Sequence, residues 1–139
     1  IWVHLRPTSP FRDPKVIDQA INYFVDNLNN SSSLRSAHIA PESPLKWFVK
    51  KNEYFKGFVN SDISNLPKEV FEQTYIPNGY VDIIRSSTVI KKNNIHGDKM
   101  LAFISPTIYE IDSLEEFNFI SYQMEKSDSV LKDYLTKNI

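Results

Sequence analysis

The 139-residue chain contains no cysteine, which excludes disulfide bonds, thiolate metal sites and cysteine nucleophiles. It also has no excess of positive charge: 16 Lys and Arg against 17 Asp and Glu give a formal net charge of -1, which does not favour nucleic-acid phosphates. No hydrophobic run reaches the roughly 18 residues that span a bilayer, and no signal-peptide pattern is visible. We therefore expect a cytoplasmic protein that binds neither nucleic acid nor a membrane.

Glycine is rare as well. The three glycines, at positions 57, 79 and 97, do not form a glycine-rich loop of the kind whose backbone amides hold phosphates. The remaining composition, with 41% hydrophobic and 24% charged residues, is that of an ordinary folded protein. The length fits one domain, so we expect residues 1–139 to form a single cooperative unit.

The apolar pattern predicts strands that alternate with helices. Asp13 and Pro14 are typical of a helix start, and apolar residues recur at three- and four-residue spacing as far as Leu28. Ser113 and Glu116 form a predicted capping box that begins a second long helix. This alternation favours an α/β protein with a partly parallel sheet. The other predicted elements are buried strands at 1–5 and 100–104, strands at 34–40, 45–50 and 80–84, helices at 86–92 and 127–136, and an arm or flap within 52–75.

A loop rich in proline and hydroxyl residues follows the first predicted strand, at the place where open α/β sheets bind ligands. Thr8 and Ser9 offer hydroxyl groups, and Arg6 and Arg12 are suited to pair with a carboxylate or a phosphate. Because similar strings are common in plain turns, a structural turn and a ligand-binding loop both remain open.

This Arg6–Arg12 loop resembles the (Q/R)-P-T-S-P-x-R motif of the acylneuraminate cytidylyltransferase (CMP-sialic acid synthetase) family. Three later segments resemble further family motifs in the same order: Ser43–Lys46 the P-x-K turn, Pro77–Gly79 the N-G strand entry, and Glu110–Asp112 the D-I-D metal motif. The resemblance implies a three-layer, Rossmann-like nucleotide-diphospho-sugar transferase fold with a mixed sheet. It also implies a homodimer in which residues 41–78 form a dimerisation or sugar-side arm.

The resemblance implies a reaction in which CMP passes from CTP to an acidic nine-carbon keto sugar and pyrophosphate is released. Magnesium would assist, with Glu110 and Asp112 as metal ligands and catalytic groups, because residues i and i+2 of a strand face the same side. Acids that precede a helix also complement its dipole, which is the structural alternative. Glu110 replaces the usual first aspartate of the family.

The resemblance also implies sugar-side roles for Lys46, Lys68, Asn78, Asp82 and His96. Three of them have an ordinary alternative reading: an exposed cation for Lys46, a hairpin turn for Asn78 with its following glycine, and an exposed ring for His96. Lys68 is followed by glutamate where the family commonly has an Arg-Gln pair, which removes bidentate pairing with a carboxylate.

His4 and His38 lie in strand-like runs with no acid at ligand spacing, and we interpret both as structural. Members of the family open with a glycine-rich basic loop that holds the nucleotide, so the chain resembles the C-terminal portion of such an enzyme and is expected to bind CTP weakly alone. The competing hypothesis is a non-catalytic sugar-binding or dimerisation module of the same origin. A nuclease or polymerase-like domain is disfavoured by the lack of a basic surface.

Overall fold

The computed structural model describes residues 1–126 and 130–138. The chain divides into two compact units, and we describe each by itself. The first, which we call the core unit, consists of Ile1–Ala37 and Pro77–Ile139, and the second, the arm unit, is His38–Ile76. The arm unit covers nearly the same residues as the 41–78 segment for which the sequence predicts an arm.

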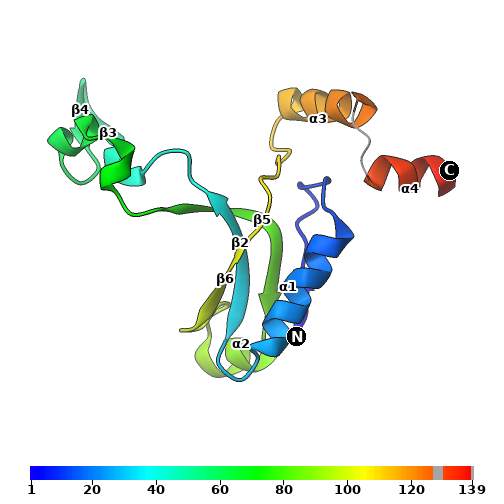
Figure 1. Ribbon diagram of the computed structural model, residues 1–139. Coiled ribbons are helices and arrows are strands. Elements are labelled where there is room, and N and C mark those ends of the chain that lie inside the picture. Colours follow the sequence, from blue (N-terminus) through cyan, green and yellow to red (C-terminus); the bar gives the residue numbers. More distant parts are fainter. Residues whose placement is uncertain (127–129, 139) are drawn as a thin grey trace. The chain divides into compact units, whose positions relative to one another are not determined.

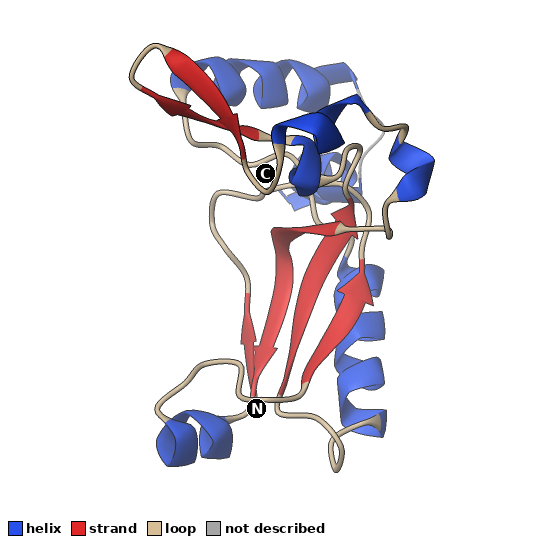
Figure 2. Ribbon diagram, turned by 90° about the vertical axis from the view of Figure 1, so that its left-hand side faces the viewer, coloured by secondary structure: helices blue, strands red, loops and turns tan. Residues whose placement is uncertain are grey.

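The core unit is built on a four-stranded sheet with the strand order β1-β5-β2-β6 (Figure 1). Strand β1 pairs antiparallel with β5, and β2 pairs parallel with β6. In Figure 2 the arrowhead of β5 points opposite to those of the other three strands, so the sheet is mixed. The predicted α/β class with a partly parallel sheet is confirmed at this level. The strands are β1 (Trp2–His4), β2 (Ser33–Ile39), β5 (Tyr75–Ile84) and β6 (Met100–Ile104).

Helix α1 (Pro14–Asp26) lies along one face of this sheet and begins as the sequence predicts. The Asp13 side chain accepts a hydrogen bond of 2.9 Å from the backbone N–H of Lys15. Phe24 of the helix is fully buried against Leu34 and Ile83 of the sheet, and burial of one such side chain stabilises the fold by about 2 kcal/mol. The short helix α2 (Ser86–Lys92) has the bounds that the sequence predicts.

The two strands predicted to be buried are not: β1 is exposed, and in β6 only Leu101 and Phe103 are partly buried against the core. Strands β1 and β6 form the two edges of the sheet, and Trp2 and Met100 are 71% and 51% exposed. A strand at an edge has only one neighbour, so an apolar run alone does not distinguish it from a central strand. The most buried strand is β5, where Tyr80, Val81 and Ile83 are almost inaccessible.

Strand β5 also begins five residues earlier than predicted, at Tyr75. Asn78 and Gly79 therefore lie within a ten-residue strand and do not form a hairpin turn or a strand entry. Gly79 has φ +60°, a left-handed value that disrupts regular strand geometry and favours glycine.

The arm unit consists of one β-hairpin and three single 3-10 turns. Strands β3 and β4 pair antiparallel, with Lys51 opposite Tyr54 and Asn52 at φ +53° in the turn between them. The strand predicted at 45–50 is thus shifted, since its first residues belong to a 3-10 turn. The bounds are β3 (Phe48–Lys51), β4 (Tyr54–Gly57), η1 (Pro44–Lys46), η2 (Ser61–Asn65) and η3 (Lys68–Val70).

The C-terminal segment contains helix α3 (Leu114–Lys126) and helix α4 (Val130–Asn138). The backbone N–H of Glu116 donates to Ser113 Oγ at 3.2 Å, as the predicted capping box requires, and the Glu116 carboxylate accepts from the N–H of Asp112 at 2.9 Å. The helix predicted at 127–136 corresponds to α4 from residue 130 onward, and residues 127–129 lie outside the described residues. Among the described residues no helix has the length and hydrophobicity needed to cross a membrane.

Candidate functional site

The loop between β1 and α1 is held in place by one arginine side chain. Arg12 donates to the carbonyl oxygens of Tyr80 at 2.7 Å, Gly79 at 3.0 Å, Arg6 at 2.6 Å and Ser9 at 2.5 Å. A guanidinium has five N–H donors, so these four bonds leave one for a ligand. Partial burial lowers the pKa of Arg12 below the ordinary value of a guanidinium, and the group keeps its charge at neutral pH. Arg12 therefore fastens the loop to β5.

Tyr80 adds a second attachment between β5 and the end of this loop. Its hydroxyl accepts a 2.7 Å hydrogen bond from the backbone N–H of Asp13, the residue that caps α1. Burial raises the pKa of Tyr80 above its ordinary value of 10.0, so the phenol is neutral under physiological conditions. The loop is thus fixed to β5 at Arg12 and at the start of α1.

At the start of this loop, Arg6 lies close to Gly79 of β5 and to Glu110. Arg6 Nη1 lies 3.8 Å from Glu110 Oε1, and both side chains are about one-third exposed. A β-carbon at Gly79 would lie 2.7 Å from Arg6 Cδ and 3.0 Å from Glu110 Oε1. The position therefore has to be glycine for the ion pair to form across it.

Three of the four segments that resemble family motifs converge at this place. In addition to the Arg6 ion pair and the Arg12 hydrogen bond to Gly79, the backbone N–H of Ile111 donates to the Thr8 carbonyl at 2.8 Å. We call the three segments Arg6–Arg12, Asn78–Tyr80 and Glu110–Asp112 the motif centre. Two of its buried polar atoms, Ser9 Oγ and Glu110 Oε1, have no hydrogen-bond partner among the described residues.

Glu110 and Asp112 do not lie on a strand, which corrects the argument from strand alternation. They belong to an irregular segment between β6 and α3. The Glu110 carboxylate faces Arg6, whereas Asp112 is exposed and its backbone N–H is bonded to Glu116. The segment is irregular because Pro106 interrupts it and the capping box of α3 begins immediately after Asp112.

The side chain of Asn78 is buried and forms hydrogen bonds within the protein. The side chain is 4% exposed, and its amide nitrogen donates to Ser105 Oγ at 2.8 Å and to the Pro106 carbonyl at 3.3 Å. Its amide oxygen accepts from the N–H of Tyr80 at 3.2 Å. The two bonds to Ser105 and Pro106 hold the segment that leads to Glu110 against β5, and the third lies within β5 itself. Asn78 positions the motif centre.

Asp82 and His96 belong to a second polar cluster on the sheet. The buried Asp82 carboxylate lies 4.0 Å from His4 Nδ1 and 3.9 Å from Arg35 Nε, and Arg35 Nη1 lies 3.5 Å from His96 Nε2. The β1–β5 register places His4 opposite Asp82, so the absence of an acid near His4 in the sequence was misleading. Sequence analysis missed Arg35. The signal that could have found it is a charged residue in the middle of β2, a strand with no other charged side chain apart from His38 when protonated.

Lys46 and Lys68 lie in the arm unit. Lys46 Nζ forms an ion pair of 3.2 Å with Glu42, four residues earlier in the chain. Lys68 lines a cavity of about 340 Å³ together with Glu42, Glu69 and Glu72. Three carboxylates beside one lysine do not favour an acidic ligand in this cavity.

The chain matches no protein-family model and no curated protein sequence.

Proposed function

We propose that this chain supplies the sugar-side and magnesium-side residues of a nucleotidyltransferase similar to the acylneuraminate cytidylyltransferases. The observation that carries the proposal is the convergence of three motif-like segments on Gly79. These segments are far apart in the sequence, the β1–β5 pairing brings the first two together, and the Arg6–Glu110 ion pair joins the third to them. In this proposal the mixed sheet is the central layer of a three-layer, Rossmann-like fold, and the protein acts as a homodimer.

The proposed reaction is attack of a hydroxyl oxygen of an acidic nine-carbon keto sugar on the α-phosphorus of CTP. A new P–O bond forms, the bond to the bridging oxygen breaks, and pyrophosphate leaves with that electron pair while the hydroxyl proton passes to a base. Arg6 is partly exposed and has donors that do not face Glu110, so it pairs with the carboxylate of the sugar. Thr8, half-buried in the same loop, offers its hydroxyl to the sugar.

The residues of the motif centre fit a magnesium ion. Carboxylate oxygens are the ligands that magnesium prefers, and Glu110 Oε1 is a buried oxygen without a hydrogen-bond partner among the described residues. Glu110 and Asp112 would hold the ion, and it would neutralise charge on the phosphates of CTP. Arg6 meanwhile offsets the charge of Glu110.

Pyrophosphate release from CTP with N-acetylneuraminate tests this function in the protein expressed from the whole reading frame that encodes the chain. We expect release that requires magnesium, and we expect Asp112→Asn to lower kcat/KM by about 100-fold or more because a metal ligand is lost. Asp133→Asn, which removes an exposed carboxylate on α4, is the matched control and should have no effect. No release with any acidic keto sugar, or equal activity of both variants, would show that the proposal is wrong.

The arm unit supports a second candidate, a non-catalytic sugar-binding or dimerisation module. Tyr54 and Phe55 on β4 are 79% and 74% exposed, and Phe55 lies 5.9 Å from Phe48 between ring centroids. Exposed aromatic side chains of this kind are enriched in protein interfaces. A dimer in sedimentation analysis that Tyr54→Ser/Phe55→Ser dissociates, while Ile90→Ser outside the arm does not, would support assembly through the arm. A monomeric chain would contradict it.

A further inference from the structure

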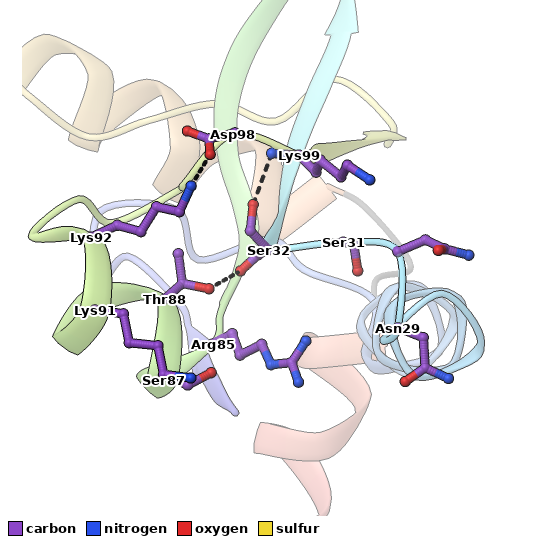
Figure 3. Close-up of a pocket in the computed structure, with 11 residues that line it drawn as sticks. Asn29, Ser31, Ser32, Arg85, Ser87, Thr88, Lys91, Lys92, Asp98 and Lys99 are labelled. Atoms are coloured by element: carbon purple, nitrogen blue, oxygen red, sulfur yellow. Dashed lines mark hydrogen bonds and ion pairs between the residues drawn. The ribbon is translucent and has the colours of Figure 1, made fainter.

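A cavity of about 400 Å³ opens at the end of the sheet where β5 ends and β2 begins (Figure 3). Three segments line it: Asn29–Ser32 before β2, Arg85–Lys92 around α2, and Asp98–Lys99 before β6. We call it the distal pocket. Arg85 follows Gly79 by six positions along β5, which corresponds to about 20 Å along an extended chain. The distal pocket is therefore separate from the motif centre.

Hydrogen bonds fix the walls of the distal pocket. Ser32 Oγ accepts from the N–H of Lys99 at 2.9 Å and donates to the His96 carbonyl at 2.6 Å, and the N–H of Ser32 donates to the Lys99 carbonyl at 2.8 Å. Thr88 Oγ1 donates to the Ser32 carbonyl at 3.3 Å, so α2 is joined to the same point (Figure 3). The pocket is thus formed before any ligand binds.

The charge of this pocket is unbalanced. It contains four cationic side chains and one carboxylate, and the carboxylate of Asp98 is already paired with Lys92. Among the described residues, the side chains of Lys91 and Lys99 form no ion pair, and Arg85 donates only to the Leu28 carbonyl at 2.9 Å. Three cations without a carboxylate partner among the described residues thus line one cavity. In a chain with a net charge of -1 they indicate an anionic ligand.

We propose that the distal pocket binds a small phosphorylated sugar. Arg85, Lys91 and Lys99 provide the charge for the phosphate, and the volume is that of a small-metabolite site. The amide groups of Asn29 and Asn30 provide donors and acceptors for sugar hydroxyls. This inference does not depend on the proposed nucleotidyl transfer.

Titration of the ¹⁵N-labelled chain with glucose 6-phosphate tests the pocket, with glucose and inorganic phosphate as separate arms. We expect saturable shifts of the backbone amides of Ser32, Thr88 and Lys99, tighter binding of glucose 6-phosphate than of phosphate, and no shifts with glucose. Equal binding of phosphate and glucose 6-phosphate would contradict the assignment to a sugar phosphate. Absence of saturation, or shifts confined to the motif centre, would contradict the site.

Two double variants distinguish specific binding in the distal pocket from nonspecific attraction of an anion to positive charge. Lys91→Gln/Lys99→Gln should weaken binding of glucose 6-phosphate about tenfold or more, because charge-assisted contacts are roughly twice as strong as neutral ones. Lys50→Gln/Lys51→Gln, in the arm hairpin, removes the same charge and should leave the affinity unchanged. All four lysines are exposed, so the variants should fold, which thermal unfolding checks. Equal losses in both pairs, or tighter binding of a single-stranded oligonucleotide at the same residues, would overturn the proposal.

Discussion

The two ends of the sheet in the core unit use their polar side chains in different ways. In the motif centre, Arg12 forms four hydrogen bonds to carbonyl groups and Asn78 forms three, so both are committed to the fold. In the distal pocket, Lys91 and Lys99 have no ion-pair partner among the described residues. In the motif centre, Arg12 and Asn78 therefore stabilise the fold around the site. In the distal pocket, Lys91 and Lys99, which belong to no motif, are available to a ligand.

The largest expected effect of a single change is that of Arg12→Ala on stability. The substitution leaves four carbonyl groups without their donor and detaches the loop from β5, so we expect the free energy of unfolding to fall by about 3 kcal/mol. Arg6→Ala, in the same loop, removes only a partly exposed ion pair and should cost less than about 1 kcal/mol. Urea denaturation measures both. Similar losses of unfolding free energy in the two variants would contradict the account, in which Arg12 stabilises the fold and Arg6 is available to a ligand.

Asn78→Asp is expected to have the next largest effect. The change keeps the shape of the side chain but replaces two donated hydrogen bonds with a buried carboxylate that faces Ser105 and the Pro106 carbonyl. We expect a loss of about 2 kcal/mol in the free energy of unfolding at neutral pH. Asn29→Asp, which is exposed in the distal pocket, should change stability by about 0.5 kcal/mol or less. A stable Asn78→Asp protein would mean that Asn78 is free for another role.

The glycines at the two ends offer a direct comparison. Gly79 and Gly97 have φ +60° and +66°, and alanine at either position should cost about 1–2 kcal/mol for the left-handed backbone. Their local effects should differ. Gly79→Ala would separate Arg6 from Glu110 and weaken binding of an acidic sugar, whereas Gly97→Ala would push against Thr88 and Ser32 and weaken binding of glucose 6-phosphate. Titration of each variant with both ligands measures this, and loss of both ligands in both variants would mean that the ends are not independent.

The smallest effect concerns the cap of α3 next to the motif centre. Hydrogen bonds from the N–H of Asp112 and from Ser113 lower the pKa of Glu116 below its ordinary value of 4.5. A carboxylate with a lowered pKa contributes stability above its unfolded pKa and loses it as the pH falls through its folded pKa. Glu116→Gln should therefore be less stable than the wild type at neutral pH, and the difference should shrink on acidification below 4.5.

Thermal unfolding across this pH range measures the effect of Glu116→Gln. Glu115→Gln removes the same charge one residue away and separates loss of charge from loss of the cap hydrogen bonds. A difference between Glu116→Gln and wild type that stays constant down to low pH would contradict the role of the cap.

Local sequence patterns predicted the elements that depend on neighbouring residues. The caps at Asp13 and Ser113 confirm this, because capping uses hydrogen bonds within a few residues. The exposure of β1 and β6 could not be predicted, since it depends on which strands take the edges of the sheet. The length of β5 was also missed, because Pro77 and Gly79 are typical of turns, whereas here both lie inside the strand, with Gly79 in a left-handed conformation.

The candidate site shows the same difference between features set by neighbouring residues and features set by distant ones. The sequence placed Arg6, Gly79 and Glu110 in separate motifs, and only the structure shows that the three residues are in contact. The structural use of Arg12 and Asn78 could not be predicted, because Arg12 bonds the carbonyl of Tyr80, 68 residues away, and Asn78 bonds Ser105 Oγ and the Pro106 carbonyl, 27 and 28 residues away. The distal pocket had no motif at all, since its cations come from three segments of different composition.

The claim that the motif centre is the sugar-binding end is tested most directly by titrating the ¹⁵N-labelled wild-type chain with N-acetylneuraminate in the presence of magnesium. We predict saturable shifts of the backbone amides of Thr8, Gly79 and Ile111, and no shifts at Thr88 or Lys99. Shifts centred on the distal pocket, or no saturable shifts in a chain whose spectrum shows it to be folded, would contradict the account.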